Sequence, residues 1–110
     1  MSPMPDLVSQ HCSGNHELLA TEDITSYLQQ LDGWTVSADG TSIHKDFSFA
    51  NFDKTIAFVN ALAWIANQEN HHPDLEVGYK HCKVHYSTHA SGGLSLYDFI
   101  CAAKIDALVL

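Results

Sequence analysis

The sequence predicts an α+β domain in which three helices pack on one face of a four-stranded antiparallel sheet, in the order α-β-β-α-β-β-α. Segments with helical spacing of apolar residues alternate along the chain with pairs of short segments that have the alternation of strands. Short turns separate the two members of each strand pair, which favours antiparallel pairing. The length of 110 residues suits one domain with one hydrophobic core.

The start of the chain differs from the rest in pattern. Prolines at positions 3 and 5 and a glycine at position 14 accompany polar residues there, and no periodicity is sustained. We therefore expect a flexible N-terminal arm over residues 1–20 and one folded domain over residues 21–110.

A helix and a hairpin are expected to open the domain. Thr21 can cap a helix that has an acidic first turn, and Gly33 ends that helix. A strand then begins at Trp34, the chain turns at residues 38–40, and a second strand follows over residues 42–49. Alternation places one set of side chains of the second strand on a common face: Ile43, Lys45, Phe47 and Phe49.

The longest apolar segment predicts a second helix that Asn51 can cap and that ends near Glu69. Pro73 disfavours helical geometry at the residue before it, which supports this end. The apolar residues form two adjoining stripes, so we expect this helix to be buried on two sides. The stripes are Phe52, Ile56, Val59, Ala63 and Ala66, widened by Phe58, Leu62 and Ile65.

A second strand pair and a last helix complete the domain. Residues 75–79 and 82–88 predict the strands. Alternation directs one set of side chains to the core: Cys82, Val84 and Tyr86. The last helix starts at Ser95, and Ser95 with Asp98 matches the capping box S-x-x-[DE]. Its apolar face carries Leu96, Phe99, Ile100, Ala103 and Ala107.

The composition disfavours several classes of partner. The formal net charge is −8, and only five lysines and no arginine are present, which argues against direct binding of nucleic acid. No apolar run reaches the roughly 20 residues that cross a membrane, so we expect no membrane partner. Three cysteines without a CxxC spacing favour free thiols, and the N-terminus lacks the pattern of a secretory signal. We therefore expect a cytoplasmic protein.

Histidine is the most unusual feature of the composition, with eight residues, and its side chain exchanges protons near neutral pH. His71-His72-Pro73 lies where the second helix must end and a strand begins. His89 lies at the end of the predicted fourth strand, and Asp98 lies in the first turn of the last helix. These segments can meet at one edge of a two-layer sandwich, where the carboxylate could orient a histidine and stabilise its protonated form.

Plainer interpretations of the same residues stay open at this point. Histidines at a helix C-terminus interact favourably with the helix dipole without any catalysis. The capping box alone accounts for Asp98. A zinc site that combines Cys82, His85 and His89 is disfavoured, because Cys82 and His85 face opposite sides of a strand, and we expect no metal. We interpret His81 and His85 as exposed strand residues, and we assign no role to His11, His16 and His44.

Several separated motifs agree in order and spacing with one known family. They are Gly33-Trp34, residues 47–52, Glu69-Asn70-His71-His72-Pro73, Tyr79, Lys83-Val84, Ser87-Thr88-His89, Gly93-Leu94 and residues 98–106. Together they resemble the signature of the pterin-4a-carbinolamine dehydratases over about residues 21–108. One position departs from that family, because Asn67 stands where an acidic residue is usual.

The resemblance implies that the chain dehydrates a 4a-hydroxytetrahydropterin to the quinonoid dihydropterin, which recycles the cofactor of aromatic amino-acid hydroxylases. It implies that His72 holds and protonates the 4a-hydroxyl group, while His71 and His89 act as acid and base. It also implies supporting or substrate-binding roles for Glu69, Pro73, Ser87, Thr88 and Asp98.

Members of this family need no metal and no organic cofactor, and they assemble as dimers or tetramers. The resemblance therefore implies a homodimer or homotetramer. It also implies that the small-molecule partner is a pterin substrate. The alternative is a non-catalytic dimerisation or assembly module on the same fold, because a fold does not determine a function. A histidine-based metal buffer is a further alternative, which predicts zinc or copper bound after purification.

Overall fold

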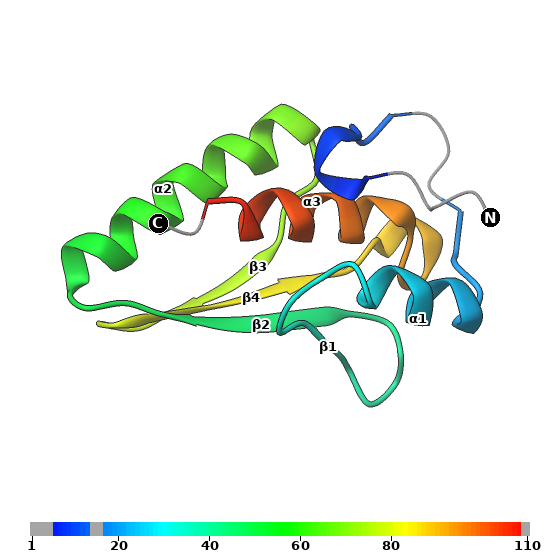
Figure 1. The fold of residues 1–110 in the computed structure, drawn as a ribbon, viewed down its shortest axis with the longest axis horizontal. Coiled ribbons are helices and arrows are strands. Elements are labelled where there is room, and N and C mark those ends of the chain that lie inside the picture. The colour runs from blue at the N-terminus through cyan, green and yellow to red at the C-terminus, as the bar shows by residue number, and fades with distance from the viewer. Residues whose placement is uncertain (1–5, 14–16, 109–110) are drawn as a thin grey trace.

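The computed structural model describes residues 6–13 and 17–108, and the predicted fold class is confirmed there. Three α-helices cover one face of a four-stranded antiparallel sheet in the predicted order (Figure 1). The helices are α1 (Thr21–Leu28), α2 (Phe52–Glu69) and α3 (Leu96–Asp106). The strands are β1 (Thr35–Val36), β2 (Ile43–Ser48), β3 (Asp74–Val77) and β4 (His81–Tyr86). Two 3₁₀ turns complete the described elements, η1 (Leu7–Ser9) and η2 (His89–Ser91).

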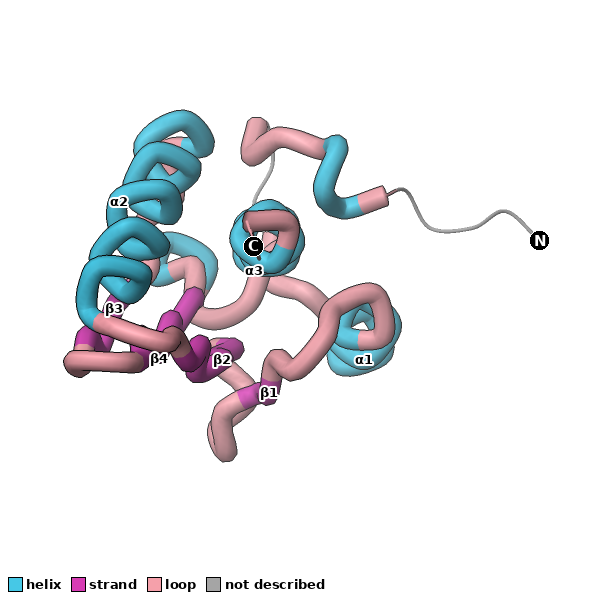
Figure 2. The backbone as a smooth tube through the Cα atoms, turned by 60° about the vertical axis from the view of Figure 1, so that its left-hand side comes forward, coloured by secondary structure: helices cyan, strands magenta, loops and turns pink. Residues whose placement is uncertain are grey.

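The sheet has the strand order β1-β2-β4-β3, and all of its neighbouring strands are antiparallel. The helices lie side by side in one layer above the strands (Figure 2). Between the layers, the predicted core face of β4 is confirmed, because its alternate side chains have no exposed surface: Cys82, Val84 and Tyr86. Ile43 and Phe47 of β2 are buried beside them, whereas Lys45 on the same face extends to the carboxylate of Asp106, with an Nζ–Oδ1 distance of 3.0 Å.

Each strand of the second pair begins one residue earlier and ends two residues earlier than predicted. The backbone N–H of Gly78 donates to the carbonyl of His81 at 2.7 Å, which closes the turn between β3 and β4. Beyond β4, Thr88 pairs with Gly93 in an isolated antiparallel bridge. His89 consequently lies in the loop that this bridge closes, as the first residue of η2, and not at the end of a strand.

Helix caps account for the bounds of α2 and α3. The Asn51 side chain accepts a hydrogen bond from the backbone N–H of Lys54 at 2.9 Å, as predicted. Helix α2 ends at Glu69 because Asn70 adopts a left-handed conformation (φ 50°), which asparagine tolerates better than most residues. The predicted cap of α1 is wrong. The N–H of Ile24 bonds to the carbonyl of Ala20, so the helix begins one residue earlier and Thr21 is its first residue.

Helix α2 is buried on one side only within the described chain, which corrects the expectation of two buried sides. Phe58, Leu62 and Ile65 face the core. In the other predicted stripe, Ala66 is buried, but Phe52 and Ala63 are exposed, and Ile56 and Val59 are only partly buried. Trp64 is 65% exposed on the same helix. The reason is that no described element of this chain covers the exposed part of that stripe at Phe52 and Ala63.

Part of the predicted arm packs against the domain. Leu7 in η1 is buried in the core, and the Nζ atom of Lys104 in α3 donates to the carbonyl of Val8 at 2.8 Å. Residues 1–5 and 14–16 of the arm lie outside the described residues. The domain boundary at residue 20 stays a prediction, but residues 6–13 are not separate from the domain.

The open face of the sheet gives a prediction about pH. Burial, together with the nearby charges of Lys83 and His85, lowers the pKa of His44. Such a histidine leaves stability intact above its unfolded pKa of about 6.5 and reduces it as the pH falls below that value, because the unfolded chain then binds the proton more tightly. We expect the free energy of unfolding to decrease below about pH 6.5, and to decrease less in His44→Gln. Urea unfolding at a series of pH values measures this, and equal pH slopes in the two proteins would contradict it.

Candidate active site

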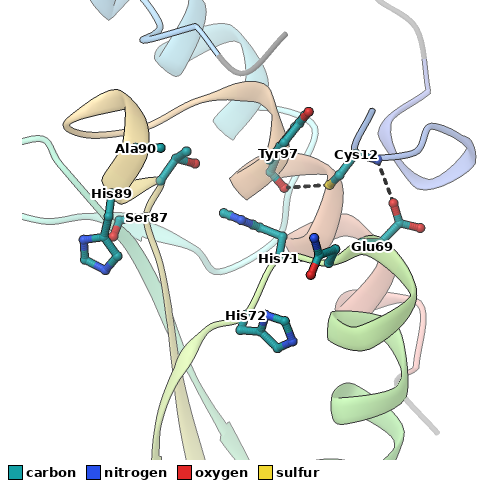
Figure 3. Close-up of a pocket in the computed structure, with 10 residues that line it drawn as sticks. Cys12, Glu69, His71, His72, Ser87, His89, Ala90 and Tyr97 are labelled. Atoms are coloured by element: carbon teal, nitrogen blue, oxygen red, sulfur yellow. Dashed lines mark hydrogen bonds between the residues drawn. The ribbon is translucent and has the colours of Figure 1, made fainter. Parts of the chain in front are cut away.

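A cavity of about 510 Å³ lies where α2 ends and where the chain passes from β4 through η2 (Figure 3). Six of the eight residues singled out from the sequence line it: Glu69, His71, His72, Ser87, Thr88 and His89. The other lining residues are Cys12, Asn70, Ala90 and Tyr97. Asp98 is fully buried and contacts the lining residues His71 and Thr88, while Pro73 follows His72 outside the lining. The edge predicted from the sequence therefore exists as a pocket.

Asp98 joins the cap of α3 to the site. Its Oδ1 atom lies 2.6 Å from Nε2 of His71. Its Oδ2 atom accepts from the hydroxyl of Thr88 at 2.9 Å and from the backbone N–H of Ser95 at 3.0 Å. The capping box is complete, so Asp98 both caps the helix and contacts a histidine.

These contacts determine which nitrogen of His71 carries a proton. An ionised carboxylate can only accept hydrogen bonds, so Nε2 of His71 donates to Asp98. In a neutral imidazole the other nitrogen, Nδ1, is then unprotonated and can accept a proton. The Thr88 hydroxyl donates to Asp98 and accepts from Ser95 Oγ at 2.7 Å, so the donors around the carboxylate form a connected chain.

The ring of His71 is held between two tyrosines. It stacks on Tyr86 with 5.1 Å between ring centroids and meets Tyr97 edge-on at 5.7 Å. The Tyr86 hydroxyl donates to the carbonyl of His71 at 3.1 Å. Burial raises the pKa of Tyr86, which keeps this donor protonated. The side chain of His71 is only 11% exposed, so its orientation is fixed by the fold.

His72 and His89 are exposed, unlike His71. Nε2 of His72 lies 3.1 Å from the side-chain oxygen of Asn67. The residue that departs from the family pattern thus occupies a place beside a candidate catalytic histidine, and it orients that ring without adding a charge. His89 and Ser87 lie on the opposite side of the cavity from Cys12 and Glu69 (Figure 3).

Thr88 supports the site by holding Asp98 and the end of β4 in place. Its hydroxyl is engaged by Asp98 and Ser95, and its backbone N–H and carbonyl pair with Gly93. The residue is 5% exposed. The Thr88 hydroxyl therefore has its hydrogen bonds inside the protein, and the neighbouring polar side chains nearer to solvent are those of Ser87 and His89.

Glu69 lies at the end of α2 on the other side of the cavity and contacts the arm. Its Oε1 atom accepts from the backbone N–H of Cys12 at 2.7 Å, and its Oε2 atom lies 2.8 Å from Nδ1 of His11. Burial by itself would raise the pKa of Glu69, but the bonds from Cys12 and His11 and the charge of Lys104 hold the pKa below its usual range.

Sequence reasoning missed three contributors to the site. Cys12 lies in a segment without periodicity, and its contact with Glu69 spans 57 positions, so no local pattern predicts this contact. Tyr97 directly precedes Asp98 in the first turn of α3, and this neighbourhood is the one feature from which its place in the site could have been predicted. His11 was assigned no role, yet it bonds to Glu69.

Metal-binding clusters and membrane-spanning helices are both absent from the part of the chain that the structure describes. Within residues 6–13 and 17–108, no three His, Cys, Asp or Glu side chains are arranged to hold a metal ion. No helix in this same part of the chain has the length and apolar character needed to cross a bilayer.

Comparison with known proteins identifies the family. The sequence model described as "Pterin 4 alpha carbinolamine dehydratase" matches residues 17–108. The chain belongs to the pterin-4a-carbinolamine dehydratase family. A Legionella pneumophila (strain Corby) protein with the name "Putative pterin-4-alpha-carbinolamine dehydratase" is 56% identical over 109 residues, 96% of each chain. A Nitrosospira multiformis protein of the same name is 57% identical over 97 residues, 88% of this chain and 84% of that protein.

Two solved structures share the fold of this chain. A transcriptional coactivator/pterin dehydratase from Brucella melitensis superposes with a TM-score of 0.78 at 28% identity, over 81% of this chain and 95% of that one. A pterin dehydratase-like protein identified as a RuBisCO assembly factor in the α-carboxysome superposes with a TM-score of 0.61 at 24% identity, over 70% and 89% of the two chains. The second likeness concerns the fold alone.

Proposed function

We propose that this member of the dehydratase family removes water from a 4a-hydroxytetrahydropterin, by histidine acid/base catalysis in the cavity beside α2. The observation that carries the proposal is the pairing of His71 with the buried Asp98 in a cavity that His72 and His89 also line. A carboxylate-oriented imidazole with a free nitrogen is a suitable base near neutral pH.

The reaction needs two proton transfers. The bond from C4a to the hydroxyl oxygen breaks, the oxygen keeps the electron pair and takes a proton, and a ring nitrogen of the pterin loses a proton. We assign protonation of the leaving oxygen to His72 and acid/base work at the ring nitrogen to His71 and His89. Ser87 offers a hydrogen bond to the edge of the pterin, while Thr88 acts by holding Asp98.

We also propose a homodimer or homotetramer of cytoplasmic chains that serves an aromatic amino-acid hydroxylase. The support for a homo-oligomer is the stripe of α2 that the described chain leaves open, with Phe52 and Ala63 exposed. A second copy over this stripe would bury the side of α2 that the sequence predicts to be covered.

The test of the proposed function is the decay of freshly generated 4a-hydroxytetrahydropterin, followed by its absorbance with and without the wild-type protein. We expect the protein to accelerate the decay well above the rate in the same buffer. A folded protein that gives no acceleration would contradict the proposed function.

The second candidate is a non-catalytic assembly module. The names of the two structural neighbours, a transcriptional coactivator and a RuBisCO assembly factor, are the observation that favours it. The intact set of His71, His72 and His89 around one cavity favours the enzyme, because an assembly role has no use for these three side chains at a shared pocket.

A further inference from the structure

We propose that Glu69 is a positioning residue that holds residues 6–13 in place as one wall of the cavity, and that this wall increases the affinity for the substrate. The inference rests on the proposed dehydratase function, since it concerns the same cavity. It assigns a role to a segment that the sequence alone predicts to be a free arm.

The Glu69 carboxylate is placed to bind the arm and not the substrate. The side chain is 2% exposed, and both of its oxygens already have partners in the arm, the N–H of Cys12 and the ring of His11. The hydrogen bond from a backbone N–H to an ionised, buried carboxylate is of the stronger, charge-assisted kind. The ring of His11 is 67% exposed, so its contact adds less.

Two further contacts hold the same segment. Leu7 is 1% exposed within the core, which buries the start of the segment. Lys104 donates to the carbonyl of Val8, and its Nζ atom lies 4.0 Å from Oε2 of Glu69. Glu69 and Lys104, from the ends of two different helices, therefore hold the same arm at neighbouring points.

The held segment is part of the cavity itself. Cys12 lines the cavity with Glu69, on the side opposite His89 (Figure 3). Its Sγ atom lies 3.8 Å from the carbonyl oxygen of Tyr97 and 3.7 Å from Sγ of Cys101. The hydrogen bond with the Cys101 thiol, together with burial, raises the pKa of Cys12, which leaves this thiol neutral and a poor nucleophile.

Loss of this wall has a specific kinetic consequence. The Glu69 carboxylate contacts the arm and Lys104, and His71 has its own partner in Asp98. A wall that contacts the substrate equally in the ground state and the transition state changes KM and leaves kcat nearly unchanged. We therefore expect Glu69→Ala to raise KM about tenfold while kcat stays within about threefold of wild type.

A double-mutant cycle tests whether Glu69 acts through the arm. Leu7→Ser releases the same segment at its other end in the full-length chain. We expect Leu7→Ser alone to raise KM, and Glu69→Ala to raise KM little further in the Leu7→Ser background. Glu76→Ala is the matched control, because Glu76 also bonds to a histidine, His85, but lies on the open face of the sheet. It should leave both constants unchanged.

Alkylation of Cys12 by iodoacetamide, followed by mass spectrometry of the folded proteins, reports the arm without any enzyme assay. We expect the rate at Cys12 to rise about tenfold in Glu69→Ala, relative to the buried Cys82 in the same protein. An unchanged rate at Cys12, or a fall in kcat with KM unchanged, would overturn the inference. If the wild type lacks dehydratase activity, the proposed function fails, and the alkylation rates still decide whether Glu69 holds the arm.

Discussion

Replacement of His89 or His72 by alanine is expected to slow the dehydration about 10²–10⁴-fold, the usual contribution of a positioned acid or base. Both side chains are exposed, so neither replacement leaves a buried group without its partner. Circular dichroism and thermal unfolding should therefore match wild type while the enzymatic rate falls. A loss of rate in these two variants can therefore be attributed to catalysis, whereas a variant at the partly buried His71 could also lose stability.

His85→Ala is the matched control for these variants. His85 is also a histidine next to a carboxylate, with Nε2 2.5 Å from Oε2 of Glu76, but it lies on the open face of the sheet. We expect its rate constant to equal that of wild type. A comparable loss in His85→Ala, or full activity in both His72→Ala and His89→Ala, would contradict the assignment of catalysis to the cavity. The decay assay for the carbinolamine measures all three variants.

Asp98→Asn is expected to keep the fold and to lose most of the activity, by about 10²–10³-fold. In wild type, Oδ2 of Asp98 accepts hydrogen bonds from the Ser95 N–H and the Thr88 hydroxyl. In the variant, the side-chain oxygen of the new asparagine therefore takes the place of Oδ2, because both donors need an acceptor. The amide NH₂ group then faces His71 and donates to Nε2. The proton of the neutral ring moves to Nδ1, which can no longer accept a proton from the substrate.

Asp98→Ala measures how much the hydrogen bonds of Asp98 contribute to stability, apart from its effect on His71. It leaves three donors without an acceptor in a fully buried place, and we expect a loss of about 2–5 kcal/mol in the free energy of unfolding. Asp46→Asn is the control for the asparagine variant, because Asp46 also contacts a histidine, His81, at 3.1 Å on the exposed face. Nitrogen NMR of His71 measures the tautomer directly. An unchanged tautomer in Asp98→Asn would contradict the mechanism.

The parts of the fold that depend on local pattern could be predicted from the sequence. The buried face of β4 follows from alternation, and the start of α2 follows from the cap at Asn51. The meeting of His71 and Asp98 could also be anticipated, because a helix end and a helix start lie at one edge of a two-layer sandwich. The Asp98 contact needed only the capping box and the order of the elements.

The features that depend on distant contacts could not be predicted in this way. The arm carries no period, so nothing in residues 6–13 indicates that Leu7 enters the core or that Cys12 meets Glu69. The stripe of Phe52 and Ala63 is apolar by sequence, yet the described chain provides no element to cover it. Periodicity states which residues prefer burial and not which surface buries them.

In the proposed mechanism, the double use of Asp98 couples catalysis to the local stability of one helical turn. The same carboxylate closes the capping box of α3 and orients His71, so fraying of that turn removes the orientation of the imidazole. Amide hydrogen exchange at the start of α3 therefore measures how often this turn opens and His71 loses its contact with Asp98. Ser95 does not line the cavity, so under the proposed function we expect substitutions at Ser95 to reduce turnover by shifting this local opening equilibrium and not by altering a group that lines the cavity.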